Sequence, residues 1–146
     1  MMQRYKYGSM LNLGYIFGEI LSKKVQLTDI DLIIPMPMHP TRLKERGFNQ
    51  SLEIAKVITK NHPEKLNHTL VQRQRYTPPQ ASLPLKERVK NIKGVFATNA
   101  DLTGKRIAIV DDVMTTGASL NELAKTLKKA GAVRVECWVV ARTLPK

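Results

Sequence analysis

Hydrophobic residues recur along this chain in two different rhythms. Residues 10–22 carry apolar side chains three and four positions apart, which is the spacing of one helical face. The runs 32–34 and 107–110 are continuously apolar, a pattern typical of strands that are buried on both faces, and the second strand is predicted over 105–110. Further strands are predicted at residues 69–72, 95–97 and 133–141.

Prolines and caps divide the first half of the chain. Three prolines within residues 35–40 argue against regular structure there. A helix is expected to follow, with Asn49 or Ser51 as its N-cap and its end before Pro63. A second proline-rich stretch at residues 76–84 predicts a loop.

The last helix is predicted to follow residue 119 directly. Ser119 and Glu122 have the spacing of a capping box, and Gly131 is suited to the C-terminal stop. Strands that alternate with helices favour an α/β fold with a parallel sheet flanked by helices, in which ligands bind at the carboxyl ends of the strands. A length of 146 residues predicts a single domain over residues 1–146.

Residues 107–119, IAIVDDVMTTGAS, carry the strongest functional signal. A buried strand runs into Asp111 and Asp112, and a turn at 113–119 leads into the helix. The first N–H groups of a helix lack intrahelical partners, so this turn suits a phosphate. The two carboxylates would repel that phosphate, and we expect them to face the hydroxyls of the same ligand or its bound cation. A ribose 5-phosphate meets both demands.

Other interpretations of this stretch are weaker. A strand that ends in two aspartates resembles a Walker B element, but the chain contains no G-x-x-x-x-G-K-[ST] segment to hold a triphosphate. It also lacks a G-x-G-x-x-G dinucleotide fingerprint. The remaining alternative is a plain strand-to-helix turn, decorated by two acids and capped by Ser119.

The net charge indicates the chemical class of the partner, and the cysteine content indicates the redox environment. The net charge is +12, from 24 basic and 12 acidic residues, which favours nucleic acid or phosphorylated small molecules. Basic residues gather at 42–46 and at 72–93, and a solvated face is an equal alternative for each cluster. The single cysteine, Cys137, excludes an internal disulfide and suits a reduced cytoplasmic protein. The histidines lack zinc-ligand spacing, and no signal peptide or membrane-inserting segment is expected.

The order of strand, acid pair and T-T-G-[AS] turn resembles the phosphoribosyl pyrophosphate signature of type I phosphoribosyltransferases. Residues 33–51, IIPMPMHPTRLKERGFNQS, narrow the match. With Arg73, Gln80, the R-V-K-N and G-V-F strings at 88–96 and the final G-A-V-R-V stretch, the chain is similar to the ComF family of competence-associated proteins. Members commonly begin with a cysteine-rich zinc ribbon that this sequence lacks, so a short or truncated member is expected.

The resemblance implies a role for each part of the site. Asp111 and Asp112 would hold the ribose hydroxyls. The 5-phosphate would be bound by Thr115, Thr116, Gly117, Ala118 and Ser119. The pyrophosphate would lie against Pro35, Met36, Pro37, Met38, His39, Arg42, Lys44 and Arg46. Residues 73–91 match a flexible hood that contacts substrate through Arg73, Arg88 and Asn91. Mg²⁺ would be held mainly by ligand oxygens.

The function that follows is transfer of the phosphoribosyl group to an unidentified acceptor, with release of pyrophosphate and a role in DNA uptake. The candidate catalytic residues are Asp111, Asp112 and Arg88. The alternative is a module without turnover, either a phosphoribosyl pyrophosphate sensor or a binder of single-stranded DNA or competence proteins, for which Arg73, Arg75 and Tyr76 would be contacts. His39 is a structural histidine or a general base, and a homodimer stays open.

Overall fold

The computed structural model describes residues 18–23, 25–74, 93–114 and 117–142, and leaves the side chains at 112–114 and 140–142 aside. Residues 18–23 are helical. The named elements that follow are β1 (Leu32–Pro35), α2 (Pro40–Arg46), α3 (Gln50–Ile58), the 3₁₀ turn η1 (Pro63–Lys65), β2 (Gln72–Arg73), β3 (Phe96–Ala97), β4 (Arg106–Met114), α5 (Ala118–Lys129) and β5 (Arg134–Arg142).

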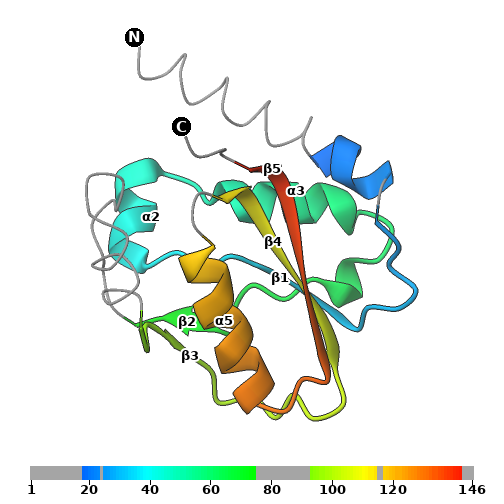
Figure 1. The fold of residues 1–146 in the computed structure, drawn as a ribbon. Helices are drawn as coiled ribbons and strands as arrows, with labels where there is room; N and C mark the ends of the chain where they lie inside the picture. The colour runs from blue at the N-terminus through cyan, green and yellow to red at the C-terminus, as the bar shows by residue number, and fades with distance from the viewer. Residues whose placement is uncertain (1–17, 24, 75–92, 115–116, 143–146) are drawn as a thin grey trace, which may run out of the picture.

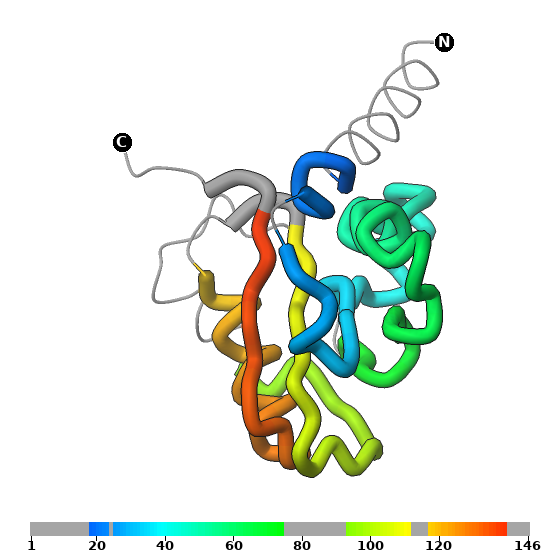
Figure 2. The backbone as a smooth tube through the Cα atoms, turned by 90° about the vertical axis from the view of Figure 1, so that its right-hand side faces the viewer, coloured from blue at the N-terminus to red at the C-terminus, as the bar shows by residue number. Residues whose placement is uncertain are grey.

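A parallel sheet lies at the centre of the described fold, in the order β1-β4-β5. Ile33 pairs with Ala108 on one side of β4, and Ile109 pairs with Cys137 on the other. The sheet stands between α5 on one face and α3 on the other (Figures 1 and 2). The predicted α/β fold with a parallel sheet flanked by helices is therefore confirmed.

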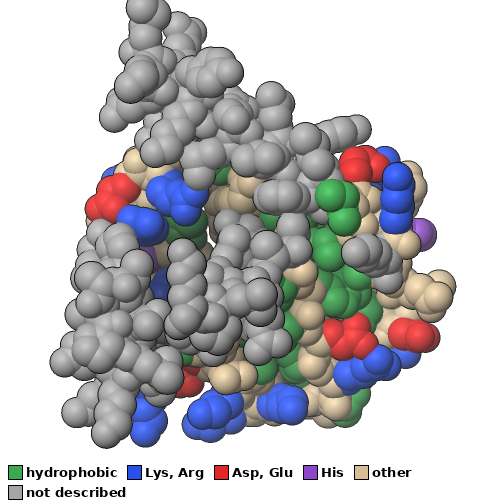
Figure 3. Space-filling view, turned by 45° about the horizontal axis from the view of Figure 1, so that its top comes forward, with side chains coloured by type: hydrophobic (Ala, Val, Ile, Leu, Met, Phe, Trp, Pro, Cys, Tyr) green, Lys and Arg blue, Asp and Glu red, His purple; other side chains and the backbone are tan. Residues whose placement is uncertain are grey.

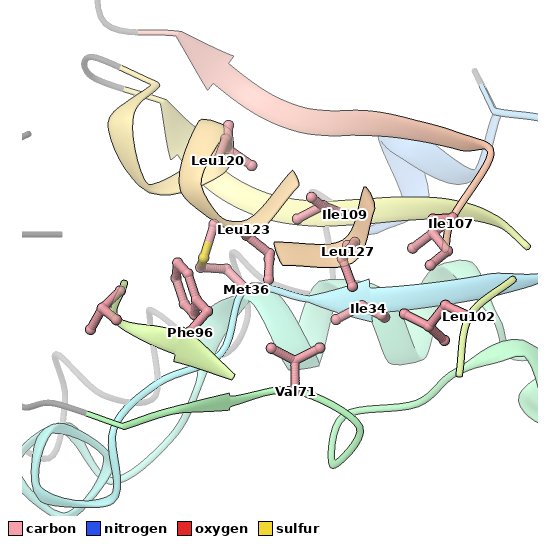
Figure 4. Packing of buried hydrophobic residues seen from close by; sticks show 12 residues of the cluster. Ile34, Met36, Val71, Phe96, Leu102, Ile107, Ile109, Leu120, Leu123 and Leu127 are labelled. Carbon is pink, nitrogen blue, oxygen red and sulfur yellow. The ribbon is translucent and has the colours of Figure 1, made fainter. Parts of the chain in front are cut away.

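Alternating side chains of the central strands fill two separate cores. Ile107 and Ile109 pack toward α5, whereas Ala108 and Val110 pack toward α3. The α5 side also includes Phe96 of β3 and Val71, the residue before β2, as the close-up in Figure 4 shows. Burial on both faces explains why β4 has an unbroken apolar run.

The short strands β2 and β3 form a second, antiparallel sheet that the sequence did not predict. The strand expected at 69–72 occurs at Gln72–Arg73, where it pairs with Phe96–Ala97. The Gln74 N–H donates to the Val95 carbonyl at 2.8 Å, which extends the pairing toward the ends of the 75–92 stretch.

Helix α2 contradicts the expectation that prolines exclude regular structure up to residue 40. Pro40 is in the first turn of α2, where its missing N–H has no partner to lose. The His39 side chain caps the helix, and Gly47 ends it with φ 85°. The following helix begins as predicted, because the Asn49 side chain accepts from the N–H groups of Ser51 and Leu52.

The start of α5 also differs from its prediction. β4 extends to Met114, beyond the expected strand end at 110, and the N-cap of α5 is Gly117 with φ 78°. Ser119 is therefore inside the helix, and no side chain caps it. Glu122, the expected capping partner, instead accepts from the Gly94 N–H at 2.9 Å. The stop at Gly131 is confirmed by its φ of 114°.

Candidate functional site

The carboxyl end of β4 brings Asp111 to the rim of the sheet. Its side chain is half-buried, and the Ser51 hydroxyl donates to its Oδ1 atom at 3.3 Å. Ser51 is 4% exposed and belongs to the first turn of α3. A side chain 60 residues earlier in the chain therefore orients the first acid of the pair.

The proline-containing loop after β1 is fixed beside this acid. The Met36 N–H donates to the Val110 carbonyl at 2.9 Å, and the Asn49 side-chain amide donates to the Met36 carbonyl at 3.1 Å. Both backbone groups of Met36 are thus occupied, and its side chain is buried in the core. The fold brings together the predicted pyrophosphate loop and Asp111, although Met36 itself has neither backbone group left for a ligand.

His39 caps α2 through its ring. Its Nδ1 atom accepts from the Thr41 N–H at 3.1 Å, which assigns the proton of a neutral imidazole to Nε2. A general base would need an acceptor nitrogen that faces the ligand, and the accepting nitrogen here is used by the helix. The geometry therefore favours the structural alternative for His39.

Arg73 lies in β2 rather than in a hood that stands away from the core. Its guanidinium carbon is 5.5 Å from the centroid of the Phe96 ring. Burial lowers the pKa of Arg73, the charge of Asp111 opposes that shift, and the charge of Arg42 adds to it. The Arg73 guanidinium is therefore within electrostatic range of both Asp111 on β4 and Arg42 on α2.

A cavity of about 520 Å³ opens between the loop after β1, α2, the start of α3 and β2. Of the residues predicted to contact pyrophosphate or to lie in the hood, its walls include Pro35, Pro37, Met38, His39 and Arg73. Arg42, Lys44 and Arg46 are not in its walls. Arg42 instead pairs with Glu45 at 3.6 Å, and the Arg46 guanidinium lies 5.7 Å from the Phe48 ring centroid.

The expected phosphate-binding turn is described only from Gly117 onward. Gly117, Ala118 and Ser119 are half-buried where the twelve-residue helix α5 begins. Thr115 and Thr116 lie outside the described residues, as does the side chain of Asp112. The same is true of Arg75, Tyr76, Arg88 and Asn91, and hence of most of the predicted hood.

Sequence reasoning missed the supporting residues Ser51, Asn49 and Phe96. Ser51 and Asn49 were interpreted only as helix caps, and nothing in the sequence indicates that Ser51 also reaches Asp111. Trp138 packs in the core and donates its indole N–H to Glu136 at 3.2 Å, whereas the neighbouring Cys137 is exposed.

A divalent cation would find hard oxygen donors in the described site, such as the Asp111 carboxylate and the Glu53 carboxylate in the cavity wall. No group of three or more histidine, cysteine or acidic side chains converges within the described ranges. This donor set fits Mg²⁺ that keeps most of its coordination on ligand oxygens and water. In the same part of the chain, no helix has the length and apolar character needed to cross a membrane.

Comparison with known proteins identifies the family to which this chain belongs. The model of the phosphoribosyl transferase domain matches residues 11–144. Competence protein F of Haemophilus influenzae is 30% identical over 152 residues, which cover 97% of this chain and 66% of that protein. The DNA utilization protein YhgH of Escherichia coli O6:H1 is 35% identical over 114 residues, 78% of this chain and 50% of that protein. The chain thus spans about half to two thirds of these relatives.

The fold agrees with that match. The crystal structure of a purine phosphoribosyltransferase from Pyrococcus horikoshii superposes with a TM-score of 0.57 at 21% identity, over 94% of this chain and 79% of that one. The parallel sheet flanked by helices is therefore shared with a type I phosphoribosyltransferase fold. The chain belongs to the phosphoribosyl transferase domain family and, within it, to the ComF competence proteins.

Proposed function

We propose that the chain binds phosphoribosyl pyrophosphate with Mg²⁺ and transfers its phosphoribosyl group to an acceptor. One observation carries the proposal: Asp111 and the loop after β1 meet at the carboxyl edge of the parallel sheet, where this family of domains and the general rule for open α/β sheets both locate the ligand.

The ribose part of the donor fits the end of β4. A carboxylate accepts hydrogen bonds from two vicinal hydroxyls, and Ser51 orients the Asp111 carboxylate for this role. The start of α5 presents N–H groups and the positive end of a helix dipole to the 5-phosphate. Asp112, Thr115 and Thr116 complete this part of the proposal from the sequence alone.

The leaving pyrophosphate fits the cavity side of the site. Breaking the bond from C1 to pyrophosphate leaves negative charge on the leaving group and positive charge on the sugar. Preorganised positive charge that faces the leaving group stabilises this transition state. Arg73 supplies such a charge from the cavity wall. Mg²⁺, when bound, neutralises the pyrophosphate further.

Calorimetry tests donor binding. The titrant is phosphoribosyl pyrophosphate with Mg²⁺, and the matched arms are ribose 5-phosphate alone and the donor with EDTA. We expect saturable binding of the complete donor, weaker binding of ribose 5-phosphate, and weaker binding without Mg²⁺. The absence of heat at millimolar donor would overturn the assignment of the pocket.

Pyrophosphate release separates transfer from sensing. The purified protein is incubated with donor and Mg²⁺, with and without purines, pyrimidines and ammonia as acceptors, and the pyrophosphate is quantified. An acceptor-dependent increase supports the transferase. Donor binding with no release for any acceptor supports the sensor instead.

A role in DNA uptake is the second part of the proposal, and it rests on the names of the relatives and on the net charge of +12. The contacts to single-stranded DNA predicted at Arg75 and Tyr76 lie outside the described residues. Arg73 faces the cavity and Phe96, which favours a ligand site over a strand-binding surface for this residue. Cytoplasmic location and a homodimer remain predictions.

A further inference from the structure

A second hollow lies on the other side of the β2–β3 pair, away from the loop after β1. This lysine groove has a volume of about 830 Å³ and runs between residues 93–100 and the outer face of α5. Four lysines line it: Lys93, Lys125, Lys128 and Lys129. Neither the predicted donor site nor the predicted strand-binding contacts include any of them.

The lysines are concentrated rather than spread. Lys125, Lys128 and Lys129 are three and four positions apart, so they share one face of α5 within about 6 Å of helix rise. All three are exposed, and no ion pair within the described ranges involves them. The basic cluster on α2 differs, because Arg42 pairs with Glu45 and the Arg46 guanidinium lies against the Phe48 ring. The face in Figure 3 carries both basic and acidic side chains.

The remaining walls of the groove are suited to a ligand with a flat apolar part. Phe96, Ala97, Ala100 and Ala130 contribute apolar surface, and Thr98, Asn99 and Thr126 add polar groups. The single acid, Glu122, already accepts the Gly94 N–H. A volume of about 830 Å³ is in the range of small-molecule sites, roughly 300–1,000 Å³.

We propose that the lysine groove is a second binding site, which takes a nucleoside di- or triphosphate. The phosphates lie against the compact cluster on α5, and the base lies on the apolar surface next to it. An extended nucleic acid strand would need positive charge at intervals along its length, because its phosphates are separated. Charge gathered within one turn of a helix matches a compact polyphosphate better.

The groove is connected to the donor side through Phe96. This side chain lines the groove, and the Arg73 guanidinium that contacts its ring lines the 520 Å³ cavity. Phe96 is 5% exposed, so a nucleotide in the groove acts on Arg73 through a shift of this packed ring, and occupancy of the groove alters donor affinity. This effect on donor affinity rests on the proposed function, whereas nucleotide binding in the groove does not.

Calorimetry with MgATP as the probe tests the groove. The variant is the double substitution Lys125→Ala and Lys128→Ala, and the matched control is Lys56→Ala with Lys105→Ala, which removes the same charge from exposed positions outside the groove. We expect at least tenfold weaker ATP binding in the first variant, a change below twofold in the control, and weaker binding of AMP than of ATP. Equal affinity in both variants, or no ATP binding by the wild-type protein, overturns the proposal.

Two further arms separate the alternatives. If Asp111→Asn abolishes ATP binding while the double lysine variant retains it, ATP occupies the donor site and the groove assignment is wrong. If a thymidine homopolymer binds through the same lysines and excludes ATP, the groove belongs to a nucleic acid strand instead. Donor affinity measured with and without saturating ATP tests the effect of groove occupancy on the donor site, and linkage requires the reverse effect to be equal. A failure of donor binding leaves the ATP result standing.

Discussion

An aspartate and an arginine lie near each end of β4, but only the pair at the amino end is joined by hydrogen bonds that the structure defines. At the amino end, the backbone N–H of Arg106 donates to Asp31 Oδ2 at 2.8 Å, and its guanidinium donates to both oxygens at 3.3 and 3.5 Å. At the carboxyl end, Asp111 accepts from Ser51 at 3.3 Å, and Arg73 stands against an aromatic ring at the wall of a cavity.

The Asp31–Arg106 contact is a structural ion pair between the start of β4 and the residue that precedes β1. Asp111 and Arg73 instead belong to different elements, and Arg73 lines the 520 Å³ cavity. Under the proposed function, the donor contacts both of these side chains. Matched substitutions at the two ends of one strand can therefore test the assignment.

The largest effect is expected for Asp111→Asn. Loss of the charge weakens two hydrogen bonds to the ribose, and charge-assisted hydrogen bonds contribute about 1.5–3 kcal/mol each. Donor affinity should fall about 100-fold or more by calorimetry, at roughly 1.4 kcal/mol per factor of ten, with little change in melting temperature. Asp31→Asn should show the reverse pattern, with lower thermal stability and unchanged donor affinity. Equal loss of binding in both variants would indicate misfolding rather than a lost contact.

Substitution of Arg73 is expected to lower donor affinity and substitution of Arg106 to lower thermal stability, with smaller effects than at the aspartates. Arg73→Met removes the charge from the cavity wall and should weaken donor binding about tenfold, or roughly 1.4 kcal/mol. Arg73→Lys keeps the charge but loses the planar contact with Phe96, so its affinity should lie between the two. Arg106→Met should leave affinity unchanged and lower the melting temperature. Identical affinities for wild-type protein and Arg73→Met would exclude Arg73 from the site.

The smallest effect is a pH dependence at the amino end. Hydrogen bonds from the backbone and then the side chain of Arg106 lower the pKa of Asp31 below its ordinary value of 3.8. Its contribution to stability is therefore present above pH 3.8 and is lost as the pH falls through the lower folded-state pKa. The difference in melting temperature between wild-type protein and Asp31→Asn should be constant from neutral pH to about pH 5 and shrink below pH 4. A difference that persists unchanged in acid would contradict the linkage.

Periodicity and residue chemistry were sufficient for the sheet and its flanking helices. β4 was recognised because burial on both faces requires an apolar run, and the cap at Asn49 because its side chain acts locally. Two predictions from local rules failed, one because the first turn of a helix accepts proline and one because a contact 28 residues away in the chain prevailed. Pro40 opens a helix because the first turn tolerates it, and Glu122 serves Gly94 rather than a capping box.

The candidate site was predictable only in part. The resemblance identified the loop after β1 and Asp111, which the fold brings together. The roles of Ser51 and Phe96 depend on contacts between residues far apart in the chain, and no sequence spacing reports such contacts. The position of Arg73 depends on the antiparallel pairing of β2 with β3, and the strand predictions at 69–72 and 95–97 did not report that pairing.

That small pair also has a consequence for the connection between its two strands. β2 and β3 are held together by their strand pairing, by the Gln74–Val95 hydrogen bond and by the contact of Arg73 with Phe96. The connection between residues 74 and 95 therefore begins and ends at residues that are fixed to each other. The stretch between these residues can therefore be replaced while the β2–β3 pairing is kept. Because Arg88 and Asn91 of the predicted hood lie in this stretch, such a replacement tests whether the proposed donor site depends on them.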